Sequence, residues 1–68
     1  MVIDGGTLRR LREDAGLTVR QLADQAQVSP GYVSLLENNH RSNPSAPVCS
    51  RLAAALDCAI ADLRPSVR

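Results

Sequence analysis

Two apolar stripes at helical spacing, separated by only three residues, constrain what this chain can fold into more than any other feature. The spacing i, i+3, i+4, i+7 predicts a helix over residues 18–26 with one buried face. That face consists of Val19, Leu22, Ala23 and Ala26. A second helix is predicted over residues 29–38, because Ser29 is a good N-cap and Pro30 suits the first helical position. The three residues 27–29 are therefore a tight turn between two helices.

The small side chain of Ala23 lies on the face where these two helices would cross. A short connection with a small residue at the crossing lets two helices approach closely at a steep angle, which is the geometry of a helix-turn-helix. The second helix then projects from the body of the domain, where it can enter the major groove of DNA. We therefore expect a helix-turn-helix over residues 18–38 whose recognition helix is residues 29–38.

The segment before this pair predicts one further helix, over residues 7–15. Thr7 is a fair N-cap, and Gly16 suits the left-handed position that ends a helix. The apolar face of this helix consists of Leu8, Leu11 and Ala15. Residues 1–6 contain a Gly-Gly pair and no apolar pattern, so we expect a loose lead-in.

The C-terminal part of the chain predicts two more helices. Residues 40–46 are rich in turn-forming types, and a helix over residues 46–57 begins at Ser45 or Ala46 with a proline in its first turn. A short fifth helix over residues 59–64 stops at Pro65. The sequence thus predicts an all-α fold of five helices, and a chain of 68 residues is expected to form a single domain, residues 1–68.

Several classes of protein are excluded by composition. No run approaches the ~20 apolar residues of a membrane helix, and the N-terminus lacks a secretory signal, so we expect a cytoplasmic protein. Cys49 and Cys58 fall on inward-facing helical positions and are expected to be free thiols. With His40 as the one histidine, they do not have the spacing of a zinc site.

Catalytic patterns are also missing from the sequence. No Ser or Cys stands at a plausible spacing from His40 with a third orienting group, and there is no carboxylate pair or glycine-rich phosphate loop. The chain is too small to enclose a substrate pocket of the usual volume, about 300 Å³ or more. We therefore expect no enzyme, no cofactor, no metal and no small-molecule substrate.

Motifs spread over most of the chain carry a resemblance to a known family. They are Gly16-Leu17-Thr18, Gln21-Leu22-Ala23, Val28-Ser29, Tyr32-Val33-Ser34, Leu36-Glu37-Asn38, Arg41, Asn43-Pro44-Ser45, Leu52-Ala53 and Ala55-Leu56. With this spacing, residues 8–64 resemble the Cro/CI-like (XRE) helix-turn-helix family of phage and bacterial repressors. The resemblance implies a five-helix lambda-repressor-like domain that binds double-stranded DNA.

The resemblance also implies which residues face DNA. The start of the second helix would hold a phosphate through backbone N–H groups and the helix dipole, at Thr18, Val19, Arg20 and Gln21. The recognition helix would contribute Ser29, Pro30, Gly31, Tyr32, Ser34, Leu35 and Asn38. The following loop would contact a second phosphate through Asn39, His40, Arg41 and Ser42. A structural, partly buried ion pair is expected between Arg12 and Glu37.

The sequence departs from the family pattern at several positions. Gln27 and Asn39 stand where glycine is common, and Ala59 replaces a capping serine, so the fifth helix is expected to fray. The recognition helix carries no Arg, Lys or Gln aimed at bases. This helix can therefore make few direct hydrogen bonds to base edges, and the shape of the DNA would have to contribute more to sequence specificity.

Two functions are compatible with these features. The first is a phage-type or mobile-element-type transcriptional regulator, a repressor that binds a two-fold operator as a homodimer. The alternative is a protein-binding module of the same fold, antitoxin-like or directed at a host factor, since the net charge is only +1 and the recognition surface is apolar. DNA binding would fall steeply with salt, whereas protein binding through Tyr32 and Leu35 would not.

Overall fold

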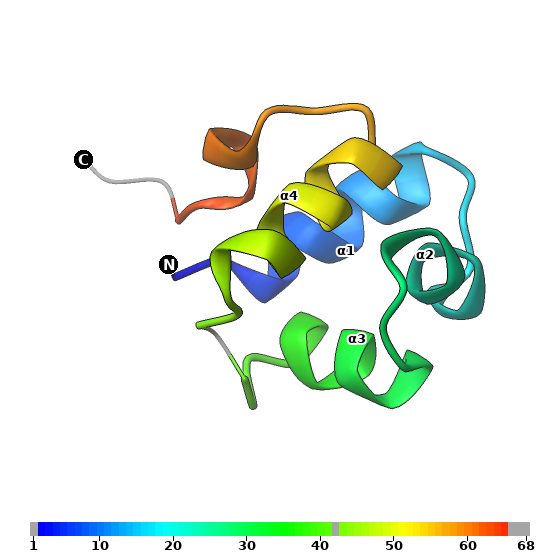
Figure 1. Ribbon diagram of the computed structural model, residues 1–68, viewed down its shortest axis with the longest axis horizontal. Helices are drawn as coiled ribbons and strands as arrows, with labels where there is room; N and C mark the ends of the chain where they lie inside the picture. Colours follow the sequence, from blue (N-terminus) through cyan, green and yellow to red (C-terminus); the bar gives the residue numbers. More distant parts are fainter. Residues whose placement is uncertain (1, 42, 66–68) are drawn as a thin grey trace.

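The computed structural model describes residues 2–41 and 43–65 and contains four α-helices (Figure 1). In chain order they are α1 (Gly5–Asp14), α2 (Val19–Ala26), α3 (Pro30–Glu37) and α4 (Ala46–Ala55). A short 3₁₀ helix, η1 (Ile60–Leu63), follows α4. The described part of the chain contains no strand. The all-helical class predicted from the sequence is therefore confirmed.

The apolar stripe of α2 lies at the centre of the core, as its spacing predicts. Leu22, Ala23 and Ala26 are fully buried, and Val19 packs at the edge of the core. Each fully buried leucine contributes about 2 kcal/mol of hydrophobic stabilisation. The other side chains with no exposed surface are Leu8, Val33, Leu36, Cys49, Leu52 and Leu63. Every helix therefore contributes to one shared core, with α2 packed against both α3 and α4.

The N-terminal segment belongs to the fold, so the expectation of a loose lead-in is wrong. Ile3 is buried, and the backbone N–H of Asp4 donates to the carbonyl oxygen of Leu63 in η1 at 2.9 Å. Ile3 and Leu8 occupy the two positions of a hydrophobic staple, one before the N-cap and one in the first helical turn. This pairing extends the core to the third residue of the chain.

The N-cap of α1 is Asp4 and not Thr7, so this helix begins two residues before the predicted start. The Oδ2 of Asp4 accepts from the backbone N–H of Thr7 at 2.9 Å and from its hydroxyl at 2.7 Å. These hydrogen bonds lower the pKa of the Asp4 carboxyl, because they favour its charged form. At the other end, Ala15 is exposed rather than on the buried face, and Gly16 has the predicted left-handed φ of +73°.

The C-terminal region differs from the prediction of a fifth α-helix. Residues 60–63 form a single 3₁₀ helix, because Ala59 has no side chain that can cap it. The Oδ2 of Asp62 instead accepts from the backbone N–H of Ala59 at 3.0 Å. The preceding helix is also shorter than predicted: α4 ends at Ala55, and Asp57 adopts a left-handed φ of +53°.

Cys49 and Cys58 are free thiols, as expected, the first buried and the second half-buried. Burial raises the pKa of the Cys58 thiol, and the carboxylates of Asp62 and Asp57 raise it further. Both effects disfavour the thiolate, so the environment of Cys58 suits a small core side chain and not a reactive nucleophile.

Candidate nucleic-acid interface

The turn between α2 and α3 has the tight geometry that the sequence predicts. Gln27 adopts a left-handed conformation with φ of +59°, which costs a non-glycine residue about 1 kcal/mol or more. The backbone N–H of Val28 donates to the carbonyl oxygen of Ala23 at 3.0 Å. Ser29 then caps α3, with its side chain accepting from the N–H of Tyr32 at 3.1 Å. The turn therefore consists of residues 27–29.

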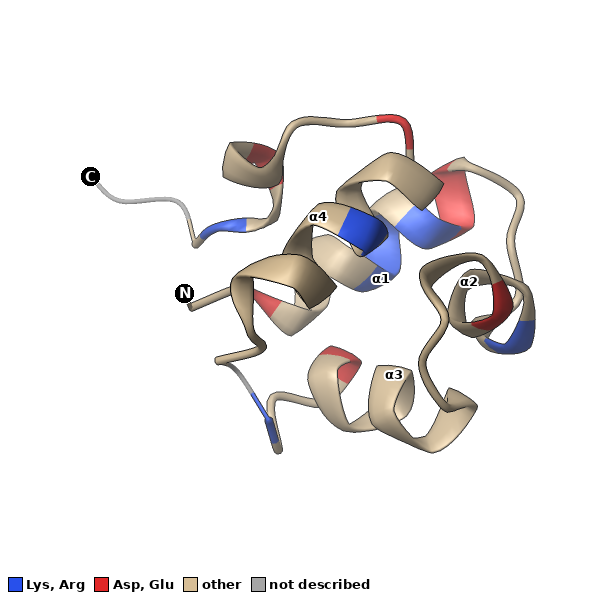
Figure 2. Cartoon of the chain, in the orientation of Figure 1, with Lys and Arg blue, Asp and Glu red and all other residues tan. Residues whose placement is uncertain are grey.

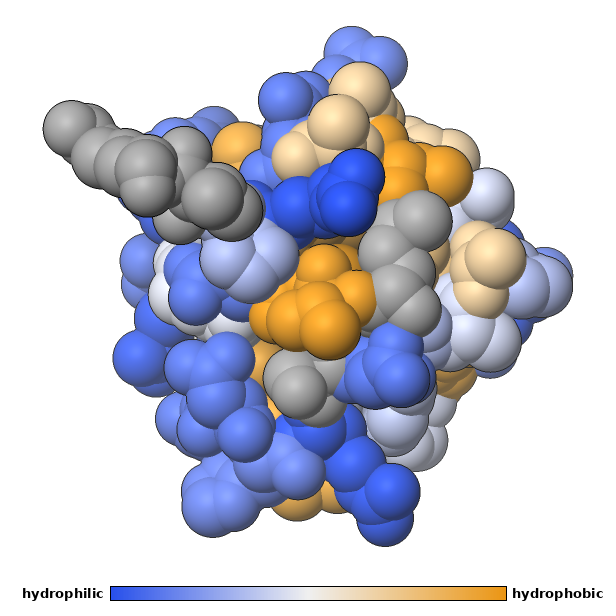
Figure 3. Space-filling model, turned by 90° about the vertical axis from the view of Figure 1, so that its left-hand side faces the viewer, coloured by the Kyte–Doolittle hydropathy of each residue, from blue (hydrophilic) through white to orange (hydrophobic). Residues whose placement is uncertain are grey.

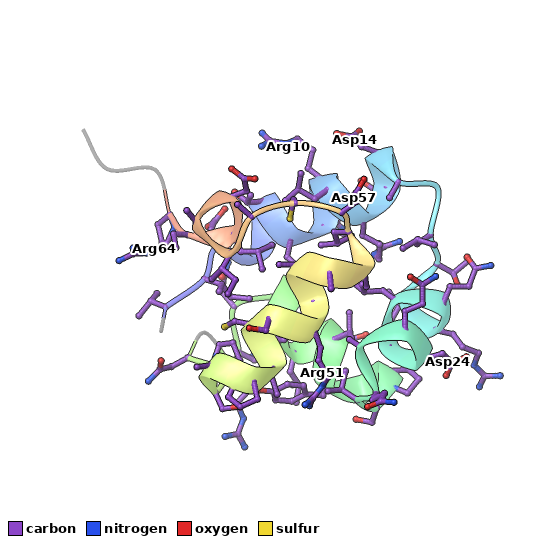
Figure 4. The ribbon with its side chains drawn as sticks, turned by 45° about the horizontal axis from the view of Figure 1, so that its top comes forward. Arg10, Asp14, Asp24, Arg51, Asp57 and Arg64 are labelled. Carbon is purple, nitrogen blue, oxygen red and sulfur yellow. The ribbon has the colours of Figure 1, made fainter. Side chains whose placement is uncertain are left out.

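A second contact fixes the end of α2 where this turn begins. The Nε of Arg51, on α4, donates to the carbonyl oxygen of Ala26 at 2.8 Å. Carbonyl groups in the last turn of a helix have no partner within the helix, so a cation that reaches them stabilises that end. Figure 4 shows Arg51 directed from α4 toward the side of the molecule formed by α2 and α3. Arg51 thus holds the turn from outside the helix-turn-helix.

The first turn of α2 leaves two backbone N–H groups for an outside partner. Thr18 and Gln21 form a reciprocal capping box, at 2.8 Å and 3.1 Å, which uses the N–H groups of both residues. The N–H groups of Val19 and Arg20 have no hydrogen-bond acceptor among residues 2–41 and 43–65. The Val19 side chain packs on the core, whereas Arg20 is exposed. The arrangement suits an anion such as a phosphate.

The recognition helix α3 has one buried face and one exposed face. The buried side chains are Val33, Leu36 and Glu37. Tyr32 and Ser34 are half-buried, with Tyr32 packed against the core. The exposed side chains on α3 and its C-cap are Pro30, Gly31, Leu35 and Asn38. Leu35 keeps 40 % of its surface exposed, although it is a large apolar residue. The outer face of α3 is therefore mostly apolar.

The C-terminal end of α3 is held against α1 by a set of contacts that we call the α1–α3 clamp: Gly5, Arg12, Glu37 and Asn39. The backbone N–H of Gly5 donates to the Oδ1 of Asn39 at 3.0 Å. A Cβ on Gly5 would lie 2.5 Å from the carbonyl oxygen of Glu37 and would also overlap that of Leu36. Only glycine allows the start of α1 to come this close to α3.

The ion pair of the clamp joins Arg12 of α1 to Glu37 of α3. The Nε of Arg12 lies 2.6 Å from the Oε2 of Glu37, and its Nη2 lies 3.2 Å from the Oε1. The side chains are only 11 % and 4 % exposed. The Nη1 of Arg12 also donates to the carbonyl oxygen of Leu17 at 2.8 Å, and its hydrogen bonds to Glu37 raise the pKa of the guanidinium. This bidentate pair fixes the angle of α3.

The loop after α3 folds back onto the helix. Asn39 has a left-handed φ of +60°, and the N–H groups of His40 and Arg41 both donate to the carbonyl oxygen of Leu35, at 2.9 Å and 3.1 Å. The side chains of His40 and Arg41 are exposed. Ser42, which the sequence also assigned to this loop, lies outside the described residues. The Oδ1 of Asn39 accepts the hydrogen bond from the N–H of Gly5, so its side chain also contributes to the fold.

The basic charges near α3 lie beside the helix and not on it. In the view of Figure 2, α3 carries no basic segment, while basic segments occur on α2 and in the loop that follows α3. These are Arg20 and Arg41, both exposed. Arg10 points away from the core on α1, next to Asp14 (Figure 4). The face shown in Figure 3 is different again, with hydrophobic side chains gathered at its middle.

Other kinds of site receive no support within residues 2–41 and 43–65. Their His, Cys, Asp and Glu side chains form no group of three or more that could hold a metal ion. No helix in this range is long and apolar enough to cross a membrane.

Two residues of the interface were missed by reasoning from the sequence. Nothing near Arg51 distinguishes it from a solvated arginine, because its partner, the carbonyl of Ala26, is 25 residues away. Gly5 had a weak signal: an apolar residue and Asp before a Gly-Gly pair match an N-cap with a staple. The close approach of Gly5 to Leu36 still depends on tertiary packing and could not be predicted.

The fold and this geometry agree with a comparison to protein families. A family model described as "Helix-turn-helix" matches residues 8–63, most of the chain. The chain belongs to this helix-turn-helix family, of the Cro/CI-like (XRE) type. The resemblance inferred from the motifs of the sequence is thereby confirmed.

Relatives within the helix-turn-helix family include two regulators of Bacillus subtilis. The chain is 30 % identical over 56 residues to the HTH-type transcriptional regulator SinR, covering 82 % of this chain and 50 % of SinR. It is 44 % identical over 52 residues to the HTH-type transcriptional repressor RghR, covering 76 % of this chain and 38 % of RghR. The chain thus spans half or less of the length of these two curated relatives.

Solved structures of the family superpose closely on this fold. The crystal structure of SinR in complex with DNA matches with a TM-score of 0.83 and 30 % identity, over 87 % of this chain and 94 % of that chain. The restriction-modification controller protein C.AhdI from Aeromonas hydrophila matches with a TM-score of 0.82 and 36 % identity, over 87 % and 88 %.

Proposed function

We propose that this chain is the DNA-binding part of a transcriptional regulator, a repressor that acts in the cytoplasm by occupying an operator. The observation that carries the proposal is the exposed helix α3 placed between two free-standing cations, Arg20 and Arg41. The similarity to SinR, whose structure is in complex with DNA, supports DNA as the ligand. The regulator does no chemistry, because occupying the site is enough to block transcription.

In the proposed complex, α3 lies in the major groove with Pro30, Gly31, Ser34 and Leu35 toward the bases. The free N–H groups at the start of α2, together with its dipole, hold one backbone phosphate. Arg41 holds a second phosphate beyond the other end of α3. These contacts fix the depth and angle of α3 but carry little sequence information themselves.

We further propose that the chain binds as a homodimer on a two-fold operator. One copy offers a single recognition helix and few phosphate contacts, which is too little for a tight specific site. Two copies related by a two-fold axis would place their α3 helices about 34 Å apart, one turn of B-DNA. Selection of a palindromic sequence with this half-site spacing would support the dimer.

The test is a binding selection from a random duplex pool, followed by titration of the enriched duplex at two salt concentrations. We expect wild-type affinity to fall steeply with salt. Arg20→Ala and Arg41→Ala should each weaken binding and lower the salt slope by about 1. Arg10→Ala is the matched control, since it removes an equally exposed arginine that points away from the core, beside Asp14, and it should change neither quantity.

A protein-binding module is the competing function, and one observation favours it. Leu35 is exposed on a face without basic residues, which suits an apolar partner. In that case the pool would yield no enriched sequence, and the weak binding that remains would respond to Arg10→Ala as much as to Arg41→Ala. Either result would contradict the regulator.

A further inference from the structure

We infer that the recognition helix reads thymine through its methyl group. Leu35 would contact the methyl group, and the missing side chain of Gly31 would leave space for it. The inference rests on the proposed function, because it requires α3 to lie in the major groove. It also specifies the base that would be recognised: operator positions that face the middle of α3 carry thymine.

The exposed face of α3 has few side chains that can donate or accept a hydrogen bond. Of its exposed side chains, Pro30 and Leu35 have no polar atom, and Gly31 has no side chain. Asn38 has an amide, but its Nδ2 donates to the carbonyl oxygen of Ser34 at 2.9 Å. Apart from this amide and the half-buried hydroxyl residues Tyr32 and Ser34, the outer face of α3 is apolar, so apolar contact is the readout that Leu35 can supply.

Gly31 leaves space on α3 that the fold itself does not use. A Cβ added at this position would meet nothing within 4 Å, and its φ lies outside the left-handed region. The fold itself therefore has no need for glycine here, and alanine would be the better helix former. What glycine leaves is free space on the outer surface of α3. Gly31 and Leu35 are four residues apart and share one face, so this space lies one turn before the leucine.

A small apolar group fits such a surface. In the major groove, the C5 methyl of thymine is the apolar group on a base edge. A leucine beside a shallow gap can bury that methyl without a clash. The exposed cations Arg20 and Arg41 on either side of α3 make a phosphate-bearing partner the better match for this apolar strip than an apolar protein surface.

The experiment uses the enriched duplex from the selection and replaces each thymine in turn with deoxyuridine. This change removes only the methyl group and leaves base pairing and phosphates intact. We expect affinity to fall about fourfold at the thymine under Leu35, the ratio that corresponds to burial of one methyl group. Leu35→Ala should abolish the difference between the thymine and uracil duplexes. Val2→Ala, at the second large exposed hydrophobic residue among those that the structure describes, is the matched control and should preserve it.

A variant of Gly31 tests the clearance separately. Gly31→Ala should raise the melting temperature and weaken binding to the thymine duplex, and the loss should shrink on the uracil duplex. Sequence-specific binding that ignores every thymine-to-uracil change would overturn the methyl readout and leave the proposed regulator intact. A selection that enriches no sequence would overturn both.

Discussion

The two ends of the recognition helix are held in different ways. The N-terminal end is held by local contacts: Ser29 caps the first turn, and Pro30 suits the first helical position. The C-terminal end is held by the α1–α3 clamp, whose partners lie 25 and 34 residues away in the sequence. The exposed face that would meet the proposed ligand extends from Pro30 to Leu35, while the angle of the helix is fixed at the second end.

Different residues of this short helix therefore stabilise the fold and contact the proposed ligand. The clamp buries an ion pair and brings two backbones into close contact, so it tolerates little change. In the first turn, Gly31 has free space around it and can take a side chain without disturbing the core. We therefore expect substitutions in the clamp to cost stability, and those at the exposed positions Gly31 and Leu35 to change mainly what is bound.

The largest expected effect is at Glu37, the buried acid of the clamp. Glu37→Ala would leave the guanidinium of Arg12 buried without its carboxylate, while its contact with the carbonyl of Leu17 remains. Removing one partner of a buried pair costs 3–5 kcal/mol in general, and we expect about 3 kcal/mol here. Denaturant unfolding at neutral pH measures the change.

The control for this prediction is Glu13→Ala, which removes the same side chain from an exposed position on α1. It should alter the free energy of unfolding by no more than about 0.5 kcal/mol. Equal effects of the two substitutions would show that the ion pair does not anchor α3.

The next largest effect is expected at Gly5, where the two helices touch. Gly5→Ala would place a Cβ against the backbone carbonyls of Leu36 and Glu37, which cannot move without shifting α3. We expect a loss of about 2 kcal/mol, as in an overpacked core. The neighbouring Gly6→Ala is a close control, since its Cβ would lie 3.5 Å from the Asp4 carboxylate, an ordinary contact. A stable Gly5→Ala variant would contradict the close approach.

The same comparison explains how far the sequence predicts this molecule. Local signals were reliable within the helix-turn-helix, where α2 and α3 begin at the predicted Thr18 and Ser29, and Ser45, one of the two predicted starts, caps α4. Each depends on residues within one or two turns of the chain. The turn residues and the exposed recognition helix therefore followed from the sequence.

Contacts between distant segments were not predictable in the same way. The hydrogen bond from the N–H of Gly5 to the side chain of Asn39 was not predicted, because α1 begins earlier than its Thr7 signal suggested. Arg51 reaches Ala26 only after α4 has packed on α2. A periodicity predicts which face of a helix is buried but not which atoms of another helix will meet it.

The smallest effect is expected at Ser29, at the locally held end of α3. Ser29→Ala removes the side-chain acceptor for the N–H of Tyr32 and should cost about 1 kcal/mol, the usual value for a helix N-cap. Because no distant segment depends on this bond, the loss should stay in the first turn. Amide hydrogen exchange should quicken at Tyr32, while the protection of the Asn38 amide, which bonds to Ser34 beside the clamp, should follow only the global stability. Faster local exchange at both amides would mean that the two ends of α3 are not held independently.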